Sequence, residues 1–156
     1  MKTLLVFLSI IALSSASSDT EKLKVDYELR LNRCKGNSCH SESAAHGQAY
    51  VSLENEDPSF SWGYTPVEEK VGSVAYQLRF HLSRVTNEKK NERYLVVGFS
   101  ARKGTLSGKQ VSWSERKFSG HNWDAFRMKS TSGTAYPEGQ ETIAPTLEVL
   151  KVTAMR

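Results

Sequence analysis

The chain has 156 residues and a formal net charge of +4, and 38% of its residues are hydrophobic. This length suits one domain with a core of its own, and so mild a charge does not by itself indicate a nucleic-acid-binding protein. No basic motif interleaved with aromatic residues is present. The composition therefore predicts a single domain without specific affinity for nucleic acid.

The N-terminus has the pattern of an export signal. Lys2 precedes the apolar run 4–13, and small residues follow up to Ala16. A helix over this run would rise about 15 Å, roughly half the hydrocarbon core of a bilayer, which argues against a membrane anchor. We therefore expect residues 1–16 to be a cleaved signal peptide and residues 17–156 to form one secreted or periplasmic domain.

Two stretches alternate strictly between apolar and polar residues. Apolar residues fall at every second position from Leu23 to Leu31, and again from Val74 to Leu82. Successive side chains of a strand point to opposite faces, so each stretch places an apolar stripe opposite a polar one. The alternation predicts strands over residues 22–33 and 73–85.

Shorter alternations bounded by turn residues predict the remaining strands. In chain order they cover residues 47–54, 60–65 (ended by Pro66), 92–101, 110–118, 123–129 and 142–155. Loops are expected over residues 34–46, 67–72, 86–91 and 130–140. Within the last strand, the apolar phase changes between Val149 and Leu150, which indicates a β-bulge with one extra residue.

No stretch repeats apolar residues at helical spacing, so little helix is expected. Seven or eight strands predict an all-β domain, either an antiparallel β-sandwich or a small β-barrel. An eight-stranded outer-membrane barrel is the alternative, because its apolar stripes would face lipid. Several strands are short, residues 92–101 and 142–155 are apolar on both faces, and the chain ends in Arg156. These features favour the form with a packed core.

Cys34 and Cys39 flank the turn residues Gly36 and Asn37. An oxidising compartment favours a disulfide between them, although a loop this short should add less than about 3 kcal/mol. With His40 and His46 the cysteines could instead bind zinc, but a disulfide removes the thiolates that zinc needs. We predict the disulfide and neither metal nor cofactor.

Basic residues are concentrated in one segment. Residues 84–117 contain nine basic and three acidic side chains, whereas residues 18–73 carry a net charge of −4. A basic surface attracts anionic partners, although strand edges and turns are also often basic. The candidate binding residues are Lys89, Lys90, Arg93, Arg102 and Lys103, together with His121 and Trp123 in the following turn.

Aromatic side chains are a second indication of binding, because their faces stack on sugars or pack against peptides. Phe60, Trp62 and Tyr64 share one face of a predicted strand. Regular alternation favours a core position for Trp62 and Trp113, whereas Trp123 follows a turn and is expected to be partly exposed.

No set of residues indicates catalysis. A G-x-S-x-G motif is absent, and the spacing of His121 and Asp124 is one that any turn can produce. We therefore expect a non-enzymatic domain that recognises a partner protein or an envelope glycan or other polyanion. The alternatives are a small outer-membrane barrel, the only form with a membrane as partner, and a small exported hydrolase or metal-binding protein.

Overall fold

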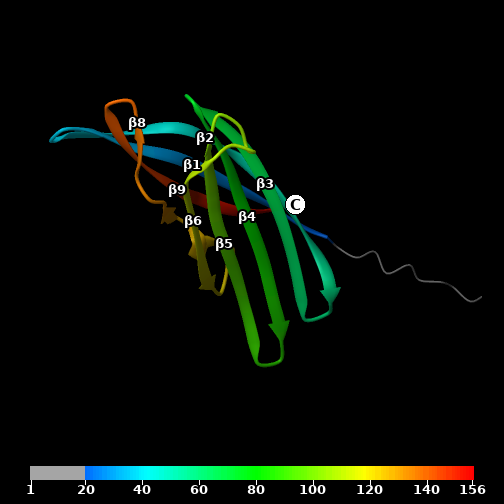
Figure 1. Cartoon of the computed structure of the whole chain (residues 1–156). Coiled ribbons are helices and arrows are strands. Elements are labelled where there is room, and N and C mark those ends of the chain that lie inside the picture. Colours follow the sequence, from blue (N-terminus) through cyan, green and yellow to red (C-terminus); the bar gives the residue numbers. More distant parts are fainter. Residues whose placement is uncertain (1–19) are drawn as a thin grey trace, which may run out of the picture.

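A computed structural model describes residues 20–156, and the predicted signal peptide lies outside the described residues. The described chain is all-β, as predicted, and its strands form a nearly closed antiparallel sheet (Figure 1). Among residues 20–156, no helix has the length and apolarity needed to cross a membrane. The elements are β1 (Glu21–Lys35), β2 (Ser38–Asp57), β3 (Phe60–Val71), β4 (Val74–Asn87), β5 (Lys90–Lys103), β6 (Gln110–Gly120), the 3₁₀ helix η1 (Trp123–Phe126), β7 (Lys129–Ser132), β8 (Tyr136–Glu138) and β9 (Glu141–Met155).

The strands follow the order β6-β5-β4-β3-β2-β1-β9-β7, and β8 pairs with β9. In Figure 1, β1, β2 and β9 cross the direction of β3, β4 and β5 steeply, so that the sheet wraps around one interior. Strand β2 joins the two halves. It pairs with β1 along most of its length but with β3 only near the turn between them, at Glu54, Asn55 and Asp57.

The alternating stripes point into this interior. The apolar residues of β1 from Leu23 to Leu31 and those of β4 from Val74 to Leu82 are all buried, and β5 and β9 add further apolar side chains. A strand that faced lipid would turn its apolar stripe outward. The observed direction is that of a barrel with a packed core.

The predicted bulge in β9 is confirmed. Asp26 of β1 pairs with Lys151, but Tyr27 pairs with Val149, so Leu150 has no partner opposite it. One extra residue reverses the alternation, and Val149 and Val152 both reach the core as a result.

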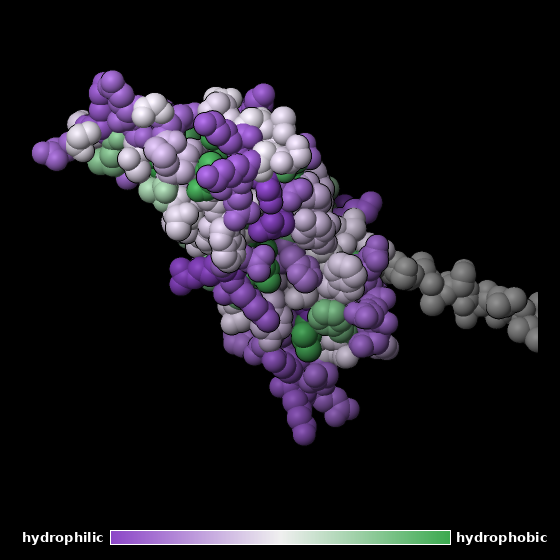
Figure 2. All heavy atoms as spheres, viewed as in Figure 1, coloured by the Kyte–Doolittle hydropathy of each residue, from purple (hydrophilic) through white to green (hydrophobic). Residues whose placement is uncertain are grey.

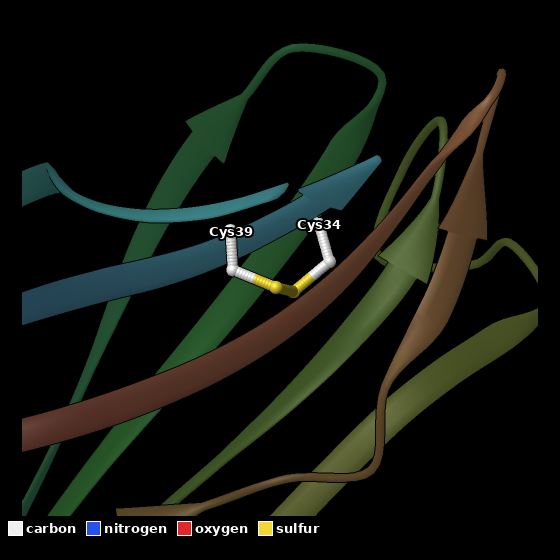
Figure 3. The surroundings of a disulfide bond; sticks show 2 residues. All are labelled: Cys34 and Cys39. Carbon is white, nitrogen blue, oxygen red and sulfur yellow. A yellow bond between two sulfur atoms is a disulfide. The ribbon is translucent and has the colours of Figure 1, made fainter. Parts of the chain in front are cut away.

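The predicted loop over residues 34–46 is wrong, because β2 already begins at Ser38. Gly36 adopts a φ of +59°, a left-handed conformation that glycine accepts readily, and the chain reverses within a short hairpin turn. This end of the hairpin is exposed on both faces and projects from the barrel (Figure 1), so apolar alternation is absent from its sequence. The predicted disulfide joins Cys34 of β1 to Cys39 of β2, which lie opposite each other in the ladder (Figure 3).

Pro66 does not end β3, which continues to Val71, so the predicted loop over residues 67–72 is also wrong. Pro66 pairs with Arg79 of β4, whereas the ladder between β2 and β3 extends no further than the pair of Glu54 and Trp62. Proline lacks an N–H group, and it is tolerated here because no ladder with β2 requires that donor.

The predicted strand over residues 123–129 is wrong, because η1 occupies Trp123–Phe126 and the next strand, β7, begins only at Lys129. The Asn122 side chain caps η1 by accepting a hydrogen bond of 3.0 Å from the backbone N–H of Ala125, and Trp123 and Phe126 are buried. The predicted loop over residues 130–140 is wrong as well, because it contains most of β7 and all of β8.

Strands β6 and β7 are the two edges of the sheet, and they face each other where the barrel closes. Side chains bridge these edges: Ser114 and Thr131 share a hydrogen bond of 2.5 Å between hydroxyls, and the Ser112 hydroxyl donates to the Thr134 carbonyl oxygen at 2.7 Å. These contacts hold the two edges together without a backbone ladder.

Removing the disulfide should destabilise the projecting hairpin only moderately. For a loop this short, we expect the double variant Cys34→Ser/Cys39→Ser to lose about 2 kcal/mol of unfolding free energy. Arg33 should still anchor this end, because it contacts Glu42, Glu138 and Glu141 at 2.5, 3.3 and 3.2 Å. Chemical denaturation measures the change, with Phe80→Ala in the core as a control expected to cost about 3–5 kcal/mol. Loss of cooperative unfolding in the double-serine variant would contradict the prediction that the disulfide stabilises only the projecting hairpin.

Three tyrosines should resist ionisation. Burial raises the pKa of Tyr27, and its hydrogen bond to Glu69 adds to the effect. Burial also raises the pKa of Tyr76 and Tyr136, whose hydroxyls bond to each other. The unfolded chain releases phenolic protons from about pH 10, whereas the folded chain retains these three, so stability should be complete below pH 10 and fall above it.

Phenolate absorbance, followed together with unfolding free energy across the alkaline range, measures this effect. Tyr27→Phe should make the alkaline loss of stability smaller. Ionisation of all the tyrosines near pH 10 in the folded protein would contradict it.

Candidate functional site

The predicted binding residues fall into two groups at opposite ends of β5. Lys89, Lys90 and Arg93 lie near its beginning, and Arg102 and Lys103 lie at its end. The nine residue-to-residue steps from Arg93 to Arg102 span about 30 Å of extended strand. One compact ligand therefore cannot contact both groups.

The two residues at the end of β5 are placed differently from those at its beginning. Arg102 donates a hydrogen bond of 3.0 Å to the Gly108 carbonyl oxygen and so supports the turn before β6. Lys103 is exposed and lines a hollow of about 200 Å³ with Val111 and Tyr136.

The β4–β5 turn forms the other end and is covered with hydrophilic side chains at the bottom of Figure 2. Lys89 is exposed in this turn. The Lys90 ammonium lies 3.1 Å from a Glu92 carboxylate oxygen and 5.6 Å from the centre of the Tyr94 ring. His121 is also exposed, and its Nδ1 lies 3.4 Å from the Asn91 carbonyl oxygen.

The expected exposure of Trp123 is wrong: only 7% of the residue is accessible. Its indole N–H donates to Glu21 at 2.9 Å, and the other carboxylate oxygen of Glu21 lies 2.5 Å from the Arg84 guanidinium. The Arg93 guanidinium lies over the indole ring, 5.4 Å from its centre. Trp123 is therefore part of the closure of this barrel end, because η1 turns it inward.

The expected core positions of Trp62 and Trp113 are also wrong, because both side chains are exposed. Trp62 is 38% exposed and Trp113 is 56% exposed, and Tyr64 is 48% exposed. The inward positions of β3 belong instead to Ser61 and Gly63. A Cβ atom at Gly63 would collide with the Ser52 carbonyl oxygen, so only glycine lets β2 cross this closely.

Tyr50 of β2, which is 55% exposed, joins Trp62 and Tyr64 around one hollow on the outer surface. We name this the aromatic groove. It measures about 390 Å³ and is lined by Tyr50, Ser52, Glu54, Trp62, Gly63, Tyr64 and Thr65. A second hollow shares Tyr50 and continues past His46 and Gln48 towards Asp26.

The groove lies where β2 and β3 separate beyond their short ladder. The Thr65 hydroxyl donates a hydrogen bond of 2.6 Å to the Tyr50 carbonyl oxygen. The Tyr50 hydroxyl donates a hydrogen bond of 2.9 Å to the side-chain oxygen of Gln48. These bonds fix the wall of the groove that β2 supplies. The sequence signal that could have located the groove is the alternation of small residues at Ser61 and Gly63 with the large aromatic residues beside them.

His81 of β4 lies beside Trp62 and Tyr64 but does not line the groove itself. It pairs with Tyr64 in the ladder, and the Trp62 ring lies edge-on to it with ring centres 5.9 Å apart. Its Nε2 atom is buried without a hydrogen-bond partner. Within residues 20–156 only two side-chain nitrogen or oxygen atoms have this property, and the other is Nε of Arg93.

Among the described residues, no group of three or more His, Cys, Asp or Glu side chains is arranged to hold a metal ion. Cys34 and Cys39 are joined in the disulfide and do not act as thiolate ligands. The arrangement of the groove, with aromatic faces and a polar border, is suited to binding.

Comparison of the chain with protein-family profiles, with curated proteins and with solved structures found no match. Function is therefore inferred from the surfaces themselves.

The three tryptophans should differ in chemical reactivity. Limited N-bromosuccinimide should oxidise Trp62 and Trp113 in the folded protein and spare Trp123, because only Trp123 is buried. Peptide mass spectrometry identifies the oxidised residues, and the unfolded chain, in which all three should react, is the control. Equal oxidation of Trp123 and Trp62 in the folded protein would contradict the placement of η1.

Proposed function

We propose that this protein is an exported, non-enzymatic glycan-binding domain that holds its ligand in the aromatic groove. One observation carries the proposal: Tyr50, Trp62 and Tyr64 present exposed rings around a single hollow with a polar border. The predicted signal peptide and the disulfide both suit an oxidising compartment outside the cytoplasm.

A sugar ring matches this surface chemically. Its C–H face packs against an aromatic ring, and its hydroxyl rim requires hydrogen-bonding groups beside that ring. Glu54, Ser52 and Gln48 supply such groups next to the three rings. A protein partner would need a contact of about 800 Å² on each side with a desolvated centre, whereas here the polar side chains of Ser52, Glu54 and Thr65 line the same hollow as the rings.

The open shape of the groove favours a chain over a small isolated ligand. Small-molecule sites bury most of their ligand in a concave pocket. The aromatic groove is shallow and adjoins the second hollow at Tyr50, so an oligosaccharide could extend from one to the other.

The groove is also ordered before binding. Rigid strands carry its rings, the Thr65 hydroxyl ties β3 to β2, and Trp62 rests against His81. A preorganised surface loses less conformational entropy when it binds.

Alanine variants test the groove against a matched surface tryptophan. Affinity electrophoresis through gels containing neutral polysaccharides should show retardation of the wild-type protein by at least one of them. Trp62→Ala should weaken that binding about tenfold, because losing one stacked ring removes up to about 1.5 kcal/mol. Tyr64→Ala should act in the same direction.

Trp113→Ala is the control, because Trp113 is exposed on β6 and lies outside the groove. It should bind as the wild-type protein does, and circular dichroism should show that all variants are folded. Absence of retardation by every polysaccharide, or equal loss in Trp113→Ala and Trp62→Ala, would refute the proposal.

A further inference from the structure

Arg93 lies at the barrel end that η1 closes and has the inward phase of β5, whereas the aromatic groove lies on the outer face of β3. Its guanidinium rests on the Trp123 ring at 5.4 Å from the ring centre. Its Nη1 atom donates to the His121 carbonyl oxygen and, at 3.2 Å, to the side-chain oxygen of Asn91. The ring and two neutral acceptors thus hold the charged group in one orientation.

The other edge of this guanidinium has no hydrogen-bond partner among the described residues. Nε is buried without a partner, and Nη2 makes no hydrogen bond or ion pair with any described residue. The N–H groups of Nε and Nη2 point in the same direction, and this edge binds two oxygens of a carboxylate, sulfate or phosphate side by side. The two donors of its bidentate edge are therefore unpaired within the described chain, with Nε covered by its neighbours.

No carboxylate of the described chain neutralises Arg93. Glu21 accepts hydrogen bonds from Trp123 and from Arg84, the residue directly opposite Arg93 in the ladder. Glu92 accepts from Tyr94 and pairs with Lys90. Glu88 and Asp124 also belong to this end, and neither forms an ion pair with Arg93 in the described structure.

Further cations surround this end of the barrel. Lys117 lies 4.6 Å from the centre of the Tyr94 ring, and Arg116 and Lys129 lie 5.1 and 5.8 Å from the centre of the Phe118 ring. Aromatic rings hold these cations, and no carboxylate of the described chain forms an ion pair with them. Lys89 adds another exposed positive charge. Together they attract anions over a distance of about one Debye length.

We propose that Arg93 anchors an oxyanion site, in which a sulfate, phosphate or carboxylate group of an anionic ligand pairs with the unpaired donors of the Nε–Nη2 edge, the buried Nε becoming accessible as the ligand binds. The surrounding lysines and arginines attract the ligand, and the edge of Arg93 provides its specific contact. This site is separate from the aromatic groove and does not depend on glycan binding there.

Nuclear magnetic resonance of the exported chain tests the site directly. The probes are sodium sulfate, sodium phosphate and sodium acetate, each compared with sodium chloride at equal ionic strength. The Nε–H signal of Arg93 and the indole N–H signal of Trp123 should shift saturably with at least one oxyanion. The three probes distinguish which oxyanion the site prefers.

Arg93→Lys keeps the charge but removes the bidentate edge, so the shift of the Trp123 indole signal should require at least about tenfold more anion. Arg102→Lys is the matched control, because Arg102 lies on the same strand and also bonds to a backbone carbonyl, but at the opposite end. It should leave the titration unchanged.

Lys117→Gln is a second variant that keeps the contact between Arg93 and Trp123. It should weaken binding less than Arg93→Lys and reduce its dependence on salt. Shifts no larger than those with chloride, or equal affinity in Arg93→Lys and the wild-type protein, would overturn the proposal.

Discussion

Burial of alternate side chains in one interior is the constraint on which the rest of this structure depends. A strand has a period of two residues, so every residue directed into the core places its neighbours on the outer surface. The inward stripes of β1, β4, β5 and β9 are apolar and fully packed. The same constraint explains the bulge at Leu150. Val149 and Val152 are three residues apart and would face opposite sides of a regular strand, so the extra residue is needed to bury both. Ligands are therefore expected on the outer face and at the ends of the barrel.

The separation of β2 from β3 creates the main feature of the outer face. The two strands share a ladder only near their turn, and beyond it the side chain of Thr65 and the close crossing at Gly63 hold them together. Because Ser61 and Gly63 face inward, Trp62 and Tyr64 must face outward. The aromatic groove thus follows from where the β2–β3 ladder ends and from which residues of β3 face outward.

The barrel end near η1 is organised by a polar cluster. Glu21 joins Trp123 to Arg84, and Trp123 supports Arg93. A buried donor without a partner costs about 1–3 kcal/mol, and such groups are uncommon in folded proteins. Of the two in the described chain, one belongs to His81 beside Trp62 and the other to Arg93 over the Trp123 ring.

The sequence by itself determined the all-β class, the long strands around Leu23–Leu31 and Val74–Leu82, the disulfide and the bulge in β9. Each of these depends on local alternation or on the short separation of two residues. The sequence could not determine which face of β3 carries Trp62, whether Trp123 is exposed, or that residues 34–46 form a hairpin and not a loop. Alternation shows that a segment is a strand. Which of its two sets of alternate side chains faces the core depends on the strands that pack against it, as β2 does against β3. Only the tertiary structure placed Tyr50 beside Trp62 and Trp123 beneath Arg93, because those positions depend on how distant segments of the chain pack.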